Sequence, residues 1–288
     1  MVTSNWNSWF VESEVEAADP EGLSLWYLGC HGFVVRSPGA TLYVDPYFGD
    51  GNPPVTVRMI PVPVDPAAVT DCDAVLVTHE HVDHLHPPSV APIAANTGAP
   101  VFTPGDAHEE YDYDGDETIP ADARASVEEG DELSIGDLTV HVRPANDPDT
   151  KFAVSYVVEC GDETLFVAGD SRPAEAFEEI GAEFDVDVAS FTVGTVGRLP
   201  LGADGGPRRT RWYMDESQVV EAANAVRADR VLPVHYDTWK GVTADPTALH
   251  EHAKSFAYPR VIEVVEVGDR VDIAEPGVVP MRRLDRTE

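Results

Sequence analysis

The chain has 288 residues and a hydrophobic content of 43%, which is enough to bury the core of one large domain over residues 1–288. It contains no run of about 18 apolar residues and no secretion signal at its start, so we expect no membrane span. Its 19 basic and 52 acidic residues give a net charge of −33, which argues against nucleic acids and anionic membranes as partners.

The first part of the chain predicts a helix followed by three strands. Residues 2–18 mix aromatic and acidic side chains and favour a short amphipathic helix. Three apolar runs separated by Gly- and Pro-containing turns predict strands over 23–28, 33–36 and 41–44. The third run ends at Asp45, and residues 49–66, which are rich in Gly and Pro, predict an irregular loop.

A group of histidines follows the next apolar run, 73–78, which has the length of a buried strand. The polar side chains of this group are His79, His81, Asp83, His84 and His86. Neutral imidazole and carboxylate are ligands that zinc, manganese and iron accept. The spacing lets His79 and His81 point one way and Asp83 and His84 another, which suits two adjacent metals. The alternative is a solvated loop, or histidines buried in a core.

The rest of the chain predicts alternating strands and helices. Helices are expected near 88–96, 173–180 and 214–227, and strands over 100–103, 138–143, 152–158, 164–168, 187–191 and 230–234. Three of these strands run into possible ligands: Asn146 and Asp147, then Asp170, then His235. His141 lies within a strand and is expected to pack there. The acidic segment 105–132 predicts a solvated surface rather than a calcium loop.

A segment rich in Gly, Pro and Arg, 194–211, is unusual in so acidic a chain. Its arginines predict either a rim that recognises phosphate or carboxylate groups or ion pairs with the acidic surface. We regard four residues of this region and of the segment after His235 as candidate substrate contacts: Arg208, Arg209, Tyr236 and Trp239.

The string His79-x-His81-x-Asp83-His84 resembles the signature of the metallo-β-lactamase fold superfamily. Gly169-Asp170-Ser171 and the strand that ends at His235 are similar to later motifs of that superfamily, in the same order. The strings Asn-Ser-Trp at 7–9, Trp-Tyr-Leu-Gly-Cys at 26–30 and Pro-Val-His-Tyr-Asp-x-Trp at 233–239 resemble the L-ascorbate-6-phosphate lactonase family. The resemblance implies a mixed α/β (α+β) fold, a four-layer αββα sandwich.

The resemblance also implies the ligands of two divalent metal ions, manganese or zinc. It assigns one metal to His79, His81 and Asp147, the other to Asp83, His84 and His235, and a bridging role to Asp170. Asp147 stands where most members have a histidine, and Asn146 and His141 remain alternatives. Asp45 is expected to orient a ligand histidine, although a strand-capping Asp is the simpler interpretation.

This ligand set predicts a metal-dependent hydrolase that acts on a small molecule. A water between two cations loses its proton readily and attacks an ester, lactone or phosphodiester, while Asp83 or Asp170 holds the proton. The family resemblance favours opening the lactone of a sugar acid or its phosphate. The alternatives are a phosphodiesterase acting on a small-molecule or lipid phosphodiester, and a regulatory member of the fold that binds metal without turnover.

Cysteine usage and charge also bear on where the protein works. Cys30, Cys72 and Cys160 are widely spaced and odd in number, which indicates free thiols in a reducing cytoplasm. Only three of the 19 basic residues are lysines, and together with the net charge this predicts a salt-rich, halophilic cytoplasm. The sequence leaves the oligomeric state open, a homo-oligomer included.

Overall fold

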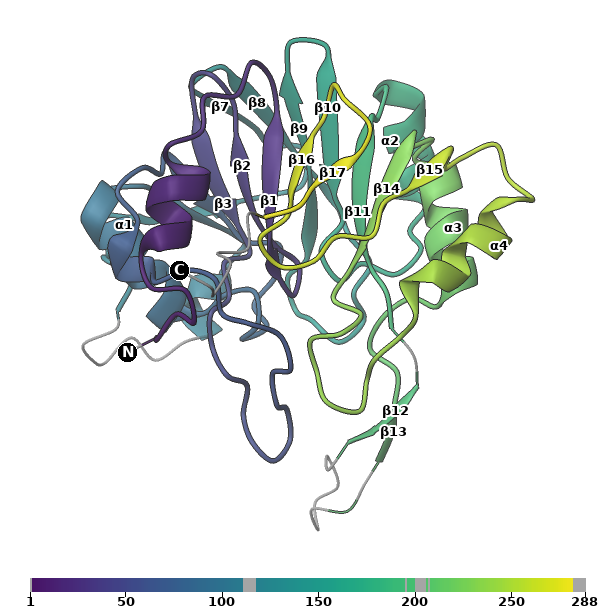
Figure 1. Ribbon diagram of the computed structural model, residues 1–288, viewed down its shortest axis with the longest axis horizontal. Helices are drawn as coiled ribbons and strands as arrows, with labels where there is room; N and C mark the ends of the chain where they lie inside the picture. Colours follow the sequence, from purple (N-terminus) through teal and green to yellow (C-terminus); the bar gives the residue numbers. More distant parts are fainter. Residues whose placement is uncertain (1, 111–117, 195, 200–205, 207, 282–288) are drawn as a thin grey trace, which may run out of the picture.

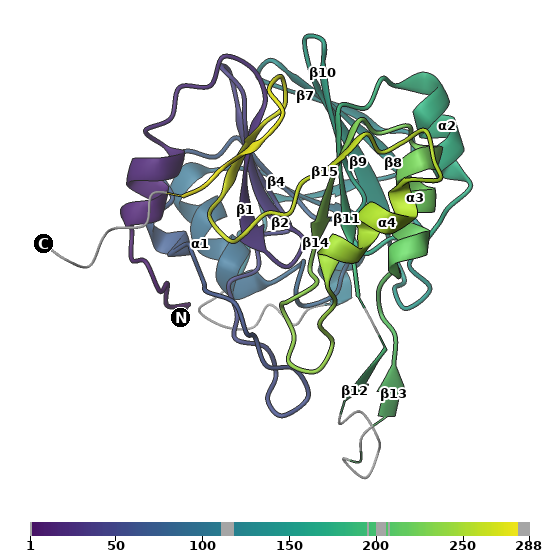
Figure 2. The same ribbon diagram turned by 45° about the vertical axis from the view of Figure 1, so that its right-hand side comes forward.

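The computed structural model describes residues 2–110, 118–194, 196–199, 206 and 208–281. Two large sheets face each other, and helices cover the outer side of each, so that the chain is built in four layers (Figure 1; Figure 2). This arrangement confirms the predicted αββα sandwich.

The first sheet has eight strands in the order β17-β16-β1-β2-β3-β4-β5-β6. Their bounds are β1 (Ser24–Gly29), β2 (Gly32–Arg36), β3 (Thr41–Val44), β4 (Ala74–Leu76), β5 (Val101–Pro104), β6 (Arg124–Val127), β16 (Arg270–Asp272) and β17 (Val278–Val279). Strands β3 to β6 are parallel neighbours. Strands β1 to β4 are buried except for the partly exposed Arg36 at the end of β2, which explains their nearly continuous apolar sequence.

The second sheet has seven strands in the order β15-β14-β11-β10-β9-β8-β7. Their bounds are β7 (Glu132–Ile135), β8 (Leu138–Pro144), β9 (Val154–Cys160), β10 (Glu163–Val167), β11 (Val188–Thr192), β14 (Arg230–Val234) and β15 (Val261–Ile262). Strands β10, β11, β14 and β15 are parallel. A separate hairpin, β12 (Gly197–Leu199) with β13 (Arg208–Thr210), projects from the body of the molecule (Figure 1).

The helices divide between the two outer layers. The helices are η1 (Phe10–Val15), η2 (Pro66–Ala68), α1 (Pro87–Thr97), η3 (Ala107–Glu110), α2 (Ala176–Glu183), α3 (Glu216–Ala225), η4 (Pro246–Ala248) and α4 (Leu249–Ala253). Apolar residues of η1 and α1 pack on the first sheet, and those of α2, α3 and α4 pack on the second. A third apolar cluster fills the space between the sheets, so the central strands of each sheet are buried on both faces.

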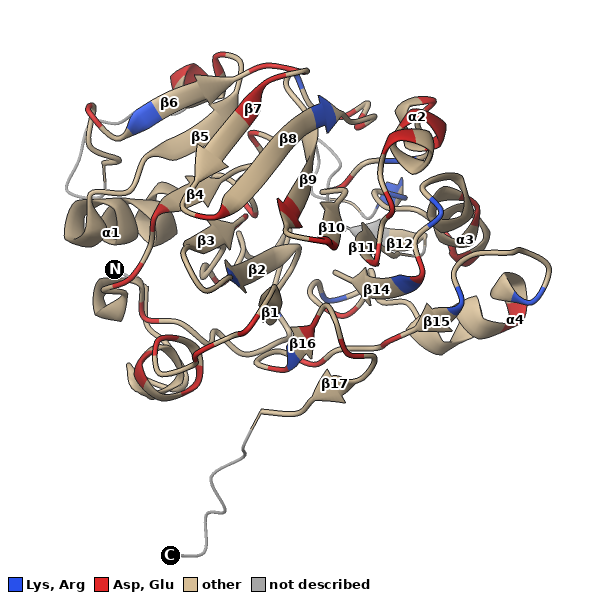
Figure 3. Ribbon diagram, turned by 90° about the horizontal axis from the view of Figure 1, so that it is seen from above, with Lys and Arg blue, Asp and Glu red and all other residues tan. Residues whose placement is uncertain are grey.

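Most predicted elements are found within a few residues of their expected positions. The acidic segment 105–132 differs, because it contains β6 and runs into β7, two edge strands with partly exposed side chains. Part of that segment, 111–117, lies outside the described residues. Acidic side chains are spread over α2, β7 and many loops, with few basic ones between them (Figure 3). In the described part of the chain, no helix combines the length and apolarity needed to cross a bilayer.

Candidate metal centre

The predicted ligands follow strands that run in the same direction. Parallel strands β3 and β4 lead to Asp45 and to the histidine loop that begins at His79. Parallel strands β10, β11 and β14 lead to Asp170 and, further along the chain, His235. Carboxyl ends of parallel strands meet at one edge of a sheet, which is where ligand sites of layered folds gather. A β-bridge between His79 and Ala153 joins the edges of the two sheets.

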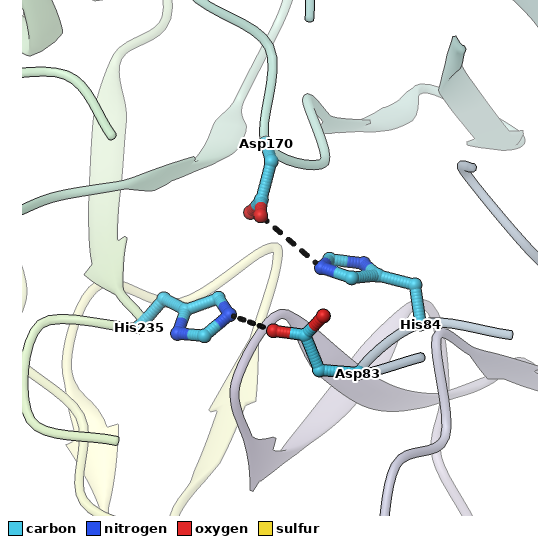
Figure 4. Close-up of side chains that lie close together, drawn as sticks. All are labelled: Asp83, His84, Asp170 and His235. Atoms are coloured by element: carbon cyan, nitrogen blue, oxygen red, sulfur yellow. Dashed lines mark ion pairs between the residues drawn. The ribbon is translucent and has the colours of Figure 1, made fainter. Parts of the chain in front are cut away.

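The four-residue cluster consists of Asp83, His84, Asp170 and His235, and it combines donors from both sheets (Figure 4). One ligand atom from each residue lies within 4.8 Å of the others. His84 Nε2 is 3.3 Å from Asp170 Oδ2, and His235 Nε2 is 3.3 Å from Asp83 Oδ2. His84 and His235 are fully buried, so the cluster lies at the bottom of the site.

The three-residue cluster consists of His79, His81 and Asp147, whose ligand atoms also lie within 4.8 Å of one another. Both His79 Nε2 and His81 Nδ1 are 3.9 Å from Asp147 Oδ2. The rings of His79 and His84 are 3.9 Å apart between centroids, so the two clusters are adjacent. The structure therefore brings together all seven predicted ligands. Asp170, to which the resemblance gave a bridging role, lies with Asp83, His84 and His235.

Asp45 and Thr78 set the orientation of two histidines. The Asp45 carboxylate lies 2.7 Å from His84 Nδ1 and accepts a hydrogen bond from Thr78 Oγ1 at 2.7 Å. A carboxylate only accepts, so His84 Nδ1 donates and Nε2 points into the cluster. Because the hydroxyl hydrogen of Thr78 is directed at Asp45, His79 Nδ1 donates to Thr78 Oγ1 at 2.9 Å. His79 Nε2 thereby carries no hydrogen and faces the cluster, 3.1 Å from His81 Nδ1.

The same argument applies to His81 and completes a donor set for cations. His81 Nε2 lies 3.3 Å from the Asp149 carbonyl oxygen, so Nε2 donates and Nδ1 faces the cluster. His84 Nε2 is buried without a hydrogen-bond partner among the described residues. Converging imidazole nitrogens whose opposite N–H groups are held by carboxylate, hydroxyl or carbonyl oxygens are the arrangement of metal-ligating histidines. The residues therefore fit a pair of divalent cations.

Burial and mutual charge shift the pKa values of the clusters. Burial, and then the nearby Asp170, raises the pKa of Asp147 to about 6. Burial raises the pKa of Asp170, but the charges of His84 and His235 outweigh burial and hold this pKa well below its usual range. Burial lowers the pKa of His84, but Asp170 and Asp45 outweigh burial and together raise this pKa well above its ordinary value. A divalent cation takes the place of such a proton when it binds among carboxylates.

The backbone is unusual at three positions of this edge. Asp45 and His235, each directly after a strand, have φ angles of 43° and 64°. These values lie in the left-handed region, which costs free energy for residues other than glycine and is concentrated at functional sites. Gly169 has φ +60°, and a Cβ atom there would lie 2.8 Å from Thr78 Oγ1. A glycine before Asp170 therefore lets the two sheet edges approach each other.

A cavity of about 350 Å³ opens beside both clusters. Its lining combines ligand candidates with aromatic residues: Thr56, His81, Val82, Asp83, Asp147, Asp149, Asp170, Trp212, Tyr213 and Trp239. The ring of Tyr213 is 4.6 Å from that of His235. A volume of this size suits one small molecule rather than a polymer.

Several predicted residues lie elsewhere. Arg208 and Arg209 are exposed on β13 and do not line the cavity. Tyr236 donates its hydroxyl hydrogen to the Val265 carbonyl and lines a different, larger cavity, whereas Trp239 does line the site. His141 packs within β8 beside Glu159, as expected from its place in the strand.

The Asn146 amide donates to the Pro173 carbonyl, which leaves Asp147 as the residue of that segment at the cluster. The sequence missed Trp212 and Tyr213, because no spacing or motif marks two aromatic residues after an Arg-rich segment.

A family model described as the β-lactamase superfamily domain matches residues 40–236. That range covers more than half of the chain and contains all seven ligand candidates. The chain belongs to the β-lactamase superfamily. Its ligand candidates therefore stand at the strand ends of a superfamily domain, as the resemblance implied.

Known members of the superfamily fold differ in their chemistry. The chain is 27% identical to the "Probable L-ascorbate-6-phosphate lactonase UlaG" of Escherichia fergusonii, over 85% of this chain and 78% of that protein. Igni18, described as a metallo hydrolase from Ignicoccus hospitalis, superposes with a TM-score of 0.64 at 21% identity, covering 86% of this chain and 97% of that one. CmlA from Streptomyces venezuelae, described as a diiron β-hydroxylase, superposes with a TM-score of 0.62 at 18% identity. The superposition covers 88% of this chain and 54% of that one. The fold alone therefore fixes neither the metal nor the reaction.

Proposed function

We propose that this superfamily member, a metal-dependent hydrolase, opens the ring ester of a small lactone or a related ester. The observation that carries the proposal is the pair of adjacent donor clusters beside a cavity of about 350 Å³. The similarity to a protein named as a lactonase, over 85% of this chain, supports the choice of a lactone over other esters.

The two clusters would hold two divalent cations. His79, His81 and Asp147 would bind one, Asp83, His84 and His235 the other, and Asp170 would bridge them. Such cations lower the pKa of a bound water toward about 7 and polarise the ester carbonyl. Three carboxylates in the set favour manganese more than a purely imidazole site would.

The protein's own groups would orient the water and the substrate. Asp83 and Asp170 both have pKa values below the usual range: burial opposes the shift, but His235 beside Asp83 and His84 beside Asp170 dominate. Both carboxylates therefore stay ionised and accept a hydrogen bond from the attacking water. Trp212, Tyr213 and Trp239 give the cavity an aromatic wall, against which a substrate ring can pack while the clusters face its ester group.

The cavity also bears on substrate charge. Among its described lining residues there is no Lys or Arg. A substrate phosphate bound there would find its counter-charge in the cations. The proposal therefore concerns the ring ester, which phosphorylated and unphosphorylated substrates share.

The test is a paired substrate panel in about molar salt, which screens the acidic surface. Metal-free protein would be reloaded with Mn²⁺ or Zn²⁺ and given sugar-acid lactones, their phosphorylated forms and an activated phosphodiester. We expect lactone opening that depends on added metal and falls on the order of 100-fold or more in His81→Ala. His250→Ala removes an exposed histidine of α4 instead and should leave the rate unchanged.

Other outcomes separate the rival functions. Phosphodiester cleavage without lactone opening would make the protein a phosphodiesterase. Tight metal binding without turnover of any substrate would identify a regulatory, non-catalytic member.

A further inference from the structure

His31 is a buried histidine outside both clusters, and its ring spans the two sheets. It lies on the turn between β1 and β2 and is fully buried. Its Nδ1 is 2.7 Å from Thr192 Oγ1 and its Nε2 is 2.9 Å from Ser190 Oγ, both on β11. Burial lowers the pKa of His31 to about 3, so the ring is neutral and carries a single N–H hydrogen.

Thr192 connects this ring to the four-residue cluster. Its Oγ1 lies 2.8 Å from Asp170 Oδ1 and 3.0 Å from the Gly169 carbonyl oxygen. Both of these atoms only accept, so they take the one hydroxyl hydrogen that Thr192 has. No hydrogen remains for His31, and Thr192 Oγ1 must therefore accept from His31 Nδ1.

This assignment fixes the direction of the whole chain of hydrogen bonds. Since His31 Nδ1 carries the hydrogen, its Nε2 accepts from the Ser190 hydroxyl. Donation then runs from Ser190 through His31 and Thr192 to Asp170, and all four side chains are buried. Hydrogen bonds in series strengthen one another in a low-dielectric interior, and a chain of this kind ends on a charged acceptor.

We propose that His31 is a positioning residue for Asp170 and acts through Thr192. The chain occupies Asp170 Oδ1, which leaves Oδ2 directed at the cluster, where His84 Nε2 is 3.3 Å away. Donation to a carboxylate favours its ionised form, and that is the form that binds a cation. The inference rests on the proposed metal centre, since His31 matters in this way only if Asp170 is a ligand.

The first test determines the tautomer of His31 in the wild-type protein. Long-range ¹H–¹⁵N correlation spectra of the metal-free protein with labelled histidine report which ring nitrogen carries the hydrogen. We expect His31, assigned by the loss of its signals in His31→Asn, as the neutral Nδ1–H form. The Nε2–H form at neutral pH would overturn the proposal, because Thr192 would then have to donate to His31. A doubly protonated ring would also overturn it, because Ser190 could not donate to His31.

The second test measures the affinity of folded, metal-free variants for Mn²⁺ and Zn²⁺ by calorimetry. His31→Leu and Thr192→Val should each weaken binding about 10–100-fold, as is typical for groups that orient ligands. His31→Asn places an amide donor close to the position of Nδ1 and should recover much of the loss. Ser190→Ala removes the partner of Nε2 but leaves the Nδ1 donor in place, so it should weaken metal binding less than His31→Leu does. His250→Ala, on the exposed side of α4, is the control and should bind metal like the wild type.

The outcomes distinguish this role from a purely structural one. If His31→Leu lowers the melting temperature but binds metal as tightly as the wild type, His31 only braces the two sheets, and the proposal fails. A wild-type protein that binds no metal would contradict the proposed metal centre itself. If His31→Leu does not fold, Thr192→Val and the tautomer spectra still decide the question.

Discussion

At the scale of single residues, Asp45 shows how a side chain that faces no substrate can control the site. Asp45 is fully buried, touches His84 and Thr78, and has a left-handed backbone. Its negative charge is therefore used to hold a ring nitrogen in place. We predict that Asp45→Asn lowers the affinity for Mn²⁺ or Zn²⁺ about 10–100-fold, measured by calorimetry on metal-free protein.

The control for Asp45→Asn removes the same charge elsewhere. Asp162 is exposed on the turn between β9 and β10, and Asp162→Asn should bind metal like the wild type. Equal affinities for both variants and the wild type would show that Asp45 has no part in holding His84 for a cation.

Asp147 gives a second prediction at this scale, because it belongs to the three-residue cluster alone. Asp147→Ala should lower the number of metal ions bound per chain from about two to about one, since the four-residue cluster keeps its donors. Elemental analysis of protein dialysed against limiting metal measures this number. Loss of both ions together would mean that the two clusters bind metal as one unit.

At the scale of elements, the start of α3 depends on a titratable cap. Asp215 accepts from the Gln218 backbone N–H while the Gln218 side chain accepts from the Asp215 N–H. Partial burial opposes the shift, but the Gln218 hydrogen bond and the Arg211 guanidinium lower the pKa of Asp215. We predict that Asp215→Ala destabilises the protein by about 1 kcal/mol, measured by denaturant unfolding at neutral pH.

The pH dependence of that difference follows from the sign of the shift. Because the folded pKa lies below the unfolded value, the stabilisation is complete above pH 3.8. It is lost as the pH falls through the folded pKa. The difference in free energy of unfolding between the wild type and Asp215→Ala should therefore become smaller at acidic pH. Asn caps the helix without titrating, so the difference in free energy of unfolding between Asp215→Asn and Asp215→Ala should not change with pH.

Elements also show what the sequence could and could not predict. The histidine loop was predictable because its donors are adjacent in sequence and follow a buried strand. Edge strands β6 and β7 were missed, since they are short, half-exposed and lie in or next to an acidic segment that resembles a solvated loop. The role of Tyr213 depends on a long-range approach to His235, which no local pattern encodes. The arginines of β13 were conspicuous in composition, but the hairpin carries them away from the cavity.

At the scale of the whole molecule, the net charge of −33 governs the response to salt. Repulsion between many exposed carboxylates weakens when the Debye length falls to about 3 Å at 1 M salt. We predict that the melting temperature rises as NaCl is raised from about 0.1 to 2 M, measured by calorimetry beside a protein of near-zero net charge. A flat or falling curve would contradict the prediction of a salt-rich cytoplasm.

The division of the ligands between the two sheets has a consequence for assay design. His84 is held from the β3–β4 side, whereas Asp170 and His235 end strands of the opposite sheet, so a bound ion would join the two halves of the sandwich. A ligand that binds only the folded state stabilises it by about 2.7 kcal/mol at a hundred times its dissociation constant. Thermal-shift measurements should therefore rank a series of divalent ions by how strongly each stabilises the folded protein, before any substrate is known.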